Sequence, residues 1–202
     1  MRAMTRIVEH PLGLSWVMEE PMQRGSHAIV DAGRVWLVDP VDDARALGRV
    51  AELGAPAAVV QLLDRHNRDC AAIAARLNVP HLKVPDAVPD APFQTLRVIR
   101  NRFWREAALW WPERRGLVVA EVLGTVPAFA VGDGAVGVHP MVRMTPPGRL
   151  RGMAPEWLLV GHGPPVHGPS VAADVDRAIA RSRRDAPKLV LKLPSLIRDA
   201  RR

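Results

Sequence analysis

The chain has 202 residues, 48% hydrophobic and 24% charged, a composition that is typical of a folded domain and excludes a wholly disordered chain. A single cysteine, Cys70, excludes an intrachain disulfide and a metal cluster built from cysteines alone. Most of the net charge of +7 lies in residues 181–202, where eight basic residues oppose two acidic ones, so the rest of the chain is nearly neutral. No apolar run reaches about 18 residues, and the first residues lack the apolar stretch of a signal peptide, so we expect a cytoplasmic protein.

The first half of the chain is predicted to alternate strands and helices. The expected elements are a strand over 5–18 that Pro11 and Gly13 interrupt, a hairpin over 26–40, a helix over 41–54, a buried strand over 57–63 and a helix over 69–78. The hairpin is predicted because Ala32-Gly33-Arg34 lies between two apolar runs. Asp69 is expected to cap the second helix, and Asn78 to end it.

The second half begins with a proline-rich segment and then returns to strands. The expected elements are strands over 93–100, 106–111, 117–124 and 156–163, a loop excursion over 125–155 and a helix over 170–185. Strand–helix alternation mixed with hairpins predicts a layered α/β protein. Trp110 and Trp111 alternate across one strand, so one faces the core and the other a second layer or a partner.

Four short segments place polar residues at the ends of strands, where α/β proteins build their sites. They are VDP at 38–40, DRHNRDC at 64–70, AEVLG at 120–124 and GHGPPVHG at 161–168. In this order they resemble the metallo-β-lactamase fold, with its Asp-ended strand, H-x-H-x-D-H loop, acid-ended strand and final G-H-G turn. The resemblance covers residues 5–180. It implies an αββα sandwich, with residues 1–185 as one domain, residues 186–202 as a basic extension, and the site at an edge between the two sheets.

The loop departs from the pattern of the family at three of its four ligand positions. Arg65 and Asn67 stand where the first two histidines belong, and Cys70 stands in place of the last one, whereas Asp69 is kept. The third histidine of the family falls at Arg102. In the resembled family the histidines at the positions of Arg65, Asn67 and Arg102 hold one metal. This first sub-site should therefore bind no metal here. Its arginines cannot ligate, but Arg65, Asn67 and Arg102 could replace the cation and hold an anionic group.

The second metal sub-site of the family keeps residues that can ligate. It becomes Asp69, Cys70, Glu121 and His162, with Glu121 in place of the bridging Asp and His162 as the final histidine. All four are competent donors for zinc or another divalent metal. The alternative is a metal-free cluster in which arginines neutralise the carboxylates, Cys70 packs as a small apolar residue and Asp69 only caps its helix.

Other polar residues are weaker candidates. Asp39 ends a strand and resembles an Asp that supports the family's site from behind, but it also suits a turn before the next helix. His66 lies between ligand positions and could turn toward the site as a supporting group or a substitute ligand. The remaining histidines have no partner by spacing and are expected at the surface or in the core: His10, His27, His81, His139 and His167.

Two functions follow from this pattern. The first is a protein with a degenerate binuclear site, a pseudoenzyme without a cofactor that binds a small-molecule ligand or a partner through the former metal cleft. The alternative is a mononuclear metal-dependent hydrolase of an anionic ester, thioester or amide, with one zinc or similar ion. Whether the protein is an enzyme is left open by the sequence.

The basic extension over 186–202 interleaves apolar and basic residues. We expect it to pack on its own domain or on a second copy of the chain, and the tryptophan-rich surface is a further candidate for self-association. Membrane and nucleic-acid contact by this segment are disfavoured, because Pro194 interrupts a continuous amphipathic helix and the body of the chain is nearly neutral.

Overall fold

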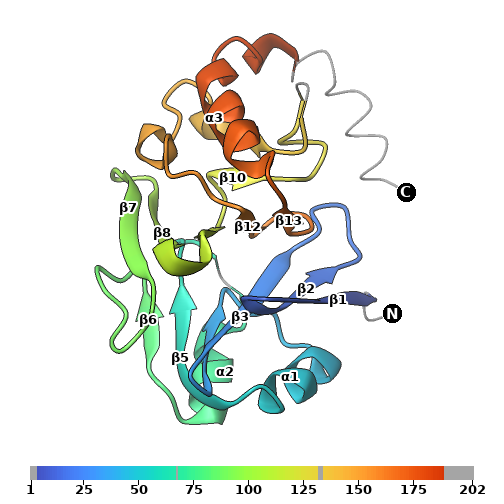
Figure 1. The fold of residues 1–202 in the computed structure, drawn as a ribbon, viewed down its shortest axis with the longest axis vertical. Coiled ribbons are helices and arrows are strands. Elements are labelled where there is room, and N and C mark those ends of the chain that lie inside the picture. The colour runs from blue at the N-terminus through green and yellow to red at the C-terminus, as the bar shows by residue number, and fades with distance from the viewer. Residues whose placement is uncertain (1–3, 67, 132–133, 189–202) are drawn as a thin grey trace.

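The computed structural model describes residues 4–66, 68–131 and 134–188, and the expected extension therefore lies mostly outside the described residues. Two sheets face each other and carry helices on their outer sides (Figure 1), as the αββα prediction requires. The first sheet contains, in spatial order, β1 (Thr5–His10), β2 (Gly13–Met18), β3 (Gly25–Asp31), β4 (Arg34–Val38), β5 (Ala55–Gln61) and β6 (His81–Lys83).

The second sheet has the spatial order β13-β12-β9-β8-β7. Its strands are β7 (Gln94–Arg100), β8 (Arg105–Trp111), β9 (Gly116–Val119), β12 (Trp157–Val160) and β13 (Val166–His167). A small separate pair joins β10 (Leu123–Gly124) to β11 (Gly137–Val138). The helices are α1 (Ala44–Ala51), α2 (Cys70–Leu77), α3 (Val171–Arg181) and the short 3-10 turns η1 (Pro112–Arg114), η2 (Pro140–Val142) and η3 (Gly148–Leu150).

The opening segment is a hairpin and not the single interrupted strand that we expected. His10 pairs with Gly13 across the turn, and β1 and β2 run antiparallel. Gly13 has a φ of +134°, and a Cβ there would lie 2.1 Å from the carbonyl oxygen of Ala28. The breakers therefore reverse the chain between β1 and β2, and position 13 needs glycine because Ala28 of β3 approaches its backbone so closely.

Helix capping matches the prediction at one end of α2 and not at the other. Asn78 ends the helix in the left-handed conformation, with a φ of 54°. Asp69, however, makes no side-chain capping bond to its helix. Its Oδ2 instead accepts a hydrogen bond of 2.7 Å from the backbone N–H of Asp42, so it ties two loops together.

The core has two layers because the central strands are buried on both faces. In β4, Trp36 and Val38 face the core between the sheets, whereas Val35 and Leu37 face the layer under α1 and α2. This alternation follows from the two-residue period of a strand. Cys70 lies in the second layer at 1% exposure, as expected of a packed small residue.

Two parallel strand pairs create the edge on which polar residues collect. β4 pairs with β5 and β9 with β12, in each case parallel, so the carboxyl ends of these strands lie at one edge of their sheets. The loops that follow them carry Asp39, His66, Glu121 and His162. No helix among the described residues is long and apolar enough to cross a membrane.

A buried histidine in β3 makes stability depend on pH. His27 is 1% exposed, and its ring joins Ser15 Oγ at 2.8 Å to the carbonyl of Val160 at 3.1 Å. Burial and the neighbouring His10 lower the pKa of His27 to about 3. The unfolded chain therefore takes up this proton first as the pH falls, and His27 should reduce the free energy of unfolding by about 2 kcal/mol between pH 7 and pH 5.

Urea unfolding at several pH values measures this effect as a difference between the wild type and His27→Gln. The amide keeps a donor and an acceptor but does not titrate, so stability should decline less in the variant as the pH falls. His167→Gln, at an exposed position, is the control and should retain the wild-type dependence. Equal decline in the wild type and His27→Gln would contradict the prediction.

Candidate metal centre

Three side chains converge at the shared edge of the sheets. One ligand atom each of His66, Glu121 and His162 lies within 4.8 Å of the others. The Nε2 atoms of His66 and His162 lie 3.0 and 3.3 Å from Glu121 Oε1. The three residues follow β5, β9 and β12, so strands of both sheets position the group.

The ring of His66 is oriented from behind by Asp39. His66 Nδ1 lies 3.1 Å from Asp39 Oδ2, and both side chains are buried. The other oxygen of Asp39 accepts a hydrogen bond of 3.1 Å from the backbone N–H of Leu62. Because a carboxylate only accepts, the contacts with Asp39 and Glu121 each require a proton on the facing ring nitrogen; release of the Nε2 proton would leave Nδ1–H toward Asp39 and free the Nε2 lone pair for an ion.

The ring of His162 is oriented by a backbone carbonyl. Its Nδ1 donates a hydrogen bond of 2.8 Å to the carbonyl oxygen of Met22, in the loop between β2 and β3. The proton on Nδ1 is therefore held by Met22, and Nε2, which lies 3.3 Å from Glu121 Oε1, is the atom of His162 that an ion could reach. Two imidazole nitrogens and one carboxylate oxygen are thus available as ligands.

A second buried carboxyl positions the turn that carries Glu121. Glu106 is fully buried, and its Oε1 accepts backbone hydrogen bonds from Ala120, Glu121 and Val122 at 3.1, 2.8 and 3.0 Å. Its Oε2 accepts from the indole N–H of Trp104 at 2.9 Å. Burial raises the pKa of Glu106 to about 7, although these hydrogen bonds oppose the rise. The sequence analysis did not single out Glu106.

The guanidinium of Arg68 compensates the acidic groups and links the start of β3 to the loops after β4 and β12. It donates to the backbone carbonyls of Gly25, Asp39 and Gly161, the last two at 2.9 and 2.8 Å. Burial acts to raise the pKa of Asp39, but His66 and Arg68 outweigh it and lower the pKa. Burial also acts to raise the pKa of Glu121, but its hydrogen bonds with His162 and His66 outweigh this effect and lower the pKa.

The same neighbours act on the ring of His66. Burial acts to lower its pKa, but the attraction of Asp39 and the bonds to the two carboxylates raise the pKa above its ordinary value. Protons and a divalent cation therefore compete for the same Nε2 atom.

His139 completes the wall of the site, although its spacing in the sequence gives no partner. Its Nδ1 accepts a hydrogen bond of 3.2 Å from the backbone N–H of Met141, so the neutral ring keeps its proton on Nε2. That atom lies 3.8 Å from Glu121 Oε2. Burial lowers the pKa of His139 to about 4, which keeps the ring neutral. His139 therefore faces the site as a donor and not as a ligand.

The structure brings together only some of the predicted site residues. Glu121 and His162 meet, as expected of one sub-site, but Asp69 and Cys70 are not part of their group. Asp69 binds the backbone of Asp42, and Cys70 packs in the core, where burial raises the pKa of its thiol to about 12. A protonated buried thiol is a poor ligand.

The residues expected to hold an anion are also separated. The Arg65 guanidinium stacks on the ring of Trp104 at 4.7 Å, and that of Arg102 on the exposed ring of Phe103 at 4.8 Å. Asn67 lies outside the described residues. His66, expected as a supporting group or a substitute ligand, lies directly in the cluster, and Asp39 contacts it from behind.

Comparisons with known proteins identify the fold. No family model matches the chain, and no curated protein matches its sequence. The metallo-β-lactamase FIM-1 from Pseudomonas aeruginosa, in its mono-zinc form, matches with a TM-score of 0.58 and 9% identity, over 91% of this chain and 98% of that one. ETHE1 from Myxococcus xanthus matches with a TM-score of 0.54 and 15% identity, over 98% of this chain and 96% of that one.

A third solved structure adds a different metal. TTHA1623 in a di-iron-bound form matches with a TM-score of 0.51 and 18% identity, over 74% of this chain and 93% of that one. At such identities the likeness shows the fold alone. The chain has the metallo-β-lactamase fold, as the strand-end motifs predicted.

The donor set is suited to one divalent metal. Two histidines and one glutamate are an established ligand set of catalytic zinc, which leaves a coordination position open. The contact of His66 with Asp39 supplies the carboxylate partner that orients a metal-binding histidine. His66, Glu121 and His162 therefore fit such an ion by chemistry as well as by proximity.

Proposed function

We propose that the protein is a mononuclear metal-dependent hydrolase whose metal is held by His66, Glu121 and His162. The observation that carries this proposal is the convergence of three ligand atoms within 4.8 Å, with an acceptor facing Nδ1 of each histidine so that Nε2 faces the site. A single metal is favoured because two further candidate ligands lie outside the cluster. Asp69 accepts a hydrogen bond from the backbone of Asp42, and Cys70 packs in the core.

In this proposal three residues assist the metal and its ligands: His139, Glu106 and Asp39. When bound, the metal would supply Lewis-acid polarisation of the carbonyl of an ester, thioester or amide. His139, neutral with its proton on Nε2, is placed to donate a hydrogen bond to a substrate oxygen. Glu106 holds the backbone that carries Glu121, and Asp39 holds His66, so that the ligands keep one geometry.

Apolar side chains surround the site and favour an apolar part in the substrate. Met22, Phe103 and Met141 are each more than two-fifths exposed. Met22 and Met141 contribute backbone contacts to His162 and His139, and Phe103 precedes Trp104, whose ring lies 4.9 Å from that of His139. Arg65, beside Trp104 and with its Nε 3.7 Å from Asp64, is the contact that we propose for an acidic group of the same substrate.

Hydrolysis of a panel of chromogenic esters, thioesters and amides by zinc-loaded protein tests the proposal. His162→Ala should reduce turnover at least about 100-fold, because it removes a ligand, and His139→Gln should reduce kcat more than it raises KM. His167→Ala, a histidine outside the site, should change turnover less than twofold. No turnover of any substrate, or equal turnover in His162→Ala, would overturn the proposal.

The second candidate function is ligand binding without chemistry. It is favoured by one observation: Glu121 Oε1 contacts both His66 and His162, so these three groups satisfy one another without an ion. Zinc-independent binding of a carboxylate ligand, unaffected by a chelator, would favour this function over hydrolysis.

A further inference from the structure

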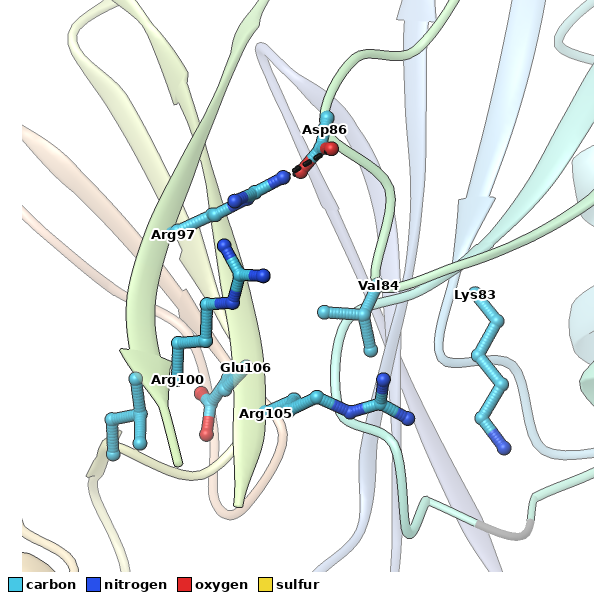
Figure 2. Close-up of a pocket in the computed structure, with 8 residues that line it drawn as sticks. Lys83, Val84, Asp86, Arg97, Arg100, Arg105 and Glu106 are labelled. Atoms are coloured by element: carbon cyan, nitrogen blue, oxygen red, sulfur yellow. Dashed lines mark hydrogen bonds and ion pairs between the residues drawn. The ribbon is translucent and has the colours of Figure 1, made fainter. Parts of the chain in front are cut away.

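A separate pocket of about 310 Å³ opens between the free edges of the two sheets. β6 is the last strand of the first sheet and β7 the last of the second, and both lie on the same side of the molecule (Figure 1). The pocket is lined by residues of β6 and the segment after it on one side, and by β7 and β8 on the other (Figure 2).

Four cations from three strands line this pocket: Lys83, Arg97, Arg100 and Arg105. In Figure 2, Arg97, Arg100 and Arg105 extend from the second sheet into the space between the edges, and Lys83 lies opposite, beyond Arg105. Two acidic residues line the same pocket, Asp86 and Glu106. Positive charge therefore exceeds negative charge in a concave space.

The acidic residues leave part of this charge without a partner. Asp86 forms an ion pair with Arg97, and Arg105 Nε lies 3.3 Å from Asp64, outside the pocket lining. Over the part of the chain that the structure describes, neither Lys83 nor Arg100 has an acidic group within ion-pair distance. The carboxyl of Glu106 is occupied by backbone N–H groups, so it does not compensate them.

An anion with several oxygens would relieve the mutual repulsion of these cations. A guanidinium binds phosphate or carboxylate through paired N–H groups, and an ammonium adds a point charge. The volume is suited to a small molecule, and Val84 and Ile99 add apolar wall beside the charges. A nucleic-acid surface would instead spread basic residues over a face of a domain, whereas these four exposed cations line one pocket.

We propose that this pocket binds a small phosphate-bearing anion, which Arg100 contacts from the second sheet and Lys83 from the opposite side. Glu106 separates the pocket from the candidate metal centre, because its carboxyl oxygens contact residues 120–122 and Trp104. The proposal does not depend on the hydrolase function.

Calorimetric titration of the full chain with inorganic pyrophosphate tests the proposal. The protein is first treated with a chelator and dialysed, so that pyrophosphate cannot bind through a metal. The double variant Lys83→Gln/Arg100→Gln should weaken binding at least about tenfold, because two charge-assisted contacts are lost. Arg45→Gln, an exposed arginine of α1, is the matched control and should change binding less than twofold. His162→Ala should also retain binding, which distinguishes this pocket from the metal centre.

Three results would overturn the proposal. They are absence of pyrophosphate binding, equal binding by the double variant, and tighter binding of a single-stranded oligonucleotide that pyrophosphate fails to displace. Either of the first two results would assign these cations another role, which is to prevent the edge strands β6 and β7 from pairing with other chains. Thermal melting of each variant establishes that it is folded.

Discussion

Replacing Arg68 with methionine is expected to lower the free energy of unfolding by about 3–5 kcal/mol, because three backbone carbonyls lose a charged donor. The guanidinium donates to the carbonyls of Gly25, at the start of β3, and of Asp39 and Gly161, in the loops after β4 and β12. Methionine retains the apolar stem but leaves these carbonyls without their donor and Asp39 without a neighbouring cation.

Urea unfolding of the metal-free protein measures this loss. Arg45→Met is the control, and it should change stability by no more than about 0.5 kcal/mol because its side chain is exposed. A loss below about 1 kcal/mol for Arg68→Met would show that water replaces the guanidinium at these carbonyls.

Replacing Glu106 with leucine should be similarly costly. Three consecutive backbone N–H groups lose their acceptor, and each buried donor without a partner costs about 1–3 kcal/mol. We expect a loss of at least about 3 kcal/mol, together with about 10–100-fold weaker metal binding, because Glu121 loses the support of its backbone.

Glu106→Gln is the matched variant, since its amide oxygen still accepts from the three N–H groups. It should lose only the bond with Trp104, about 1 kcal/mol, and should largely retain metal binding. Unfolding curves and zinc titrations of both variants measure the two effects. Equal losses in Glu106→Leu and Glu106→Gln would assign Glu106 to packing and not to the positioning of Glu121.

The fold could be predicted because its signals are local and repeated. The apolar run 57–63 marks a strand buried on both faces, and β9 takes the first part of the run 117–124. The expected strand over 117–124 is interrupted after Val119, where the chain turns at Glu121 and Leu123–Gly124 pairs separately with β11. Because parallel strands end at the same edge of a sheet, the polar residues that follow them collect at that edge, independently of the loop conformations. The turn at Gly13 was misjudged because a breaker within an apolar run is compatible with an interrupted strand and with a hairpin.

The site could be predicted only in part because side-chain direction depends on loop conformation. An alignment by motif places Asp69 and Cys70 at ligand positions, but the helix that begins at Cys70 turns its thiol into the core. His66 meets Glu121 instead, and the neighbouring carboxyl of Asp39 was the available signal. His139 lies in the glycine- and proline-rich excursion, where spacing gives no information about tertiary partners.

The metal content of the untagged protein is the decisive measurement of whether His66, Glu121 and His162 hold one metal ion. The protein is produced with added zinc, manganese and iron, purified without a chelator and analysed for elements. The account predicts about one equivalent of metal in the wild type and in Cys70→Ala, and almost none in His66→Ala. A folded wild type without metal, or a His66→Ala variant that retains a full equivalent, would contradict it.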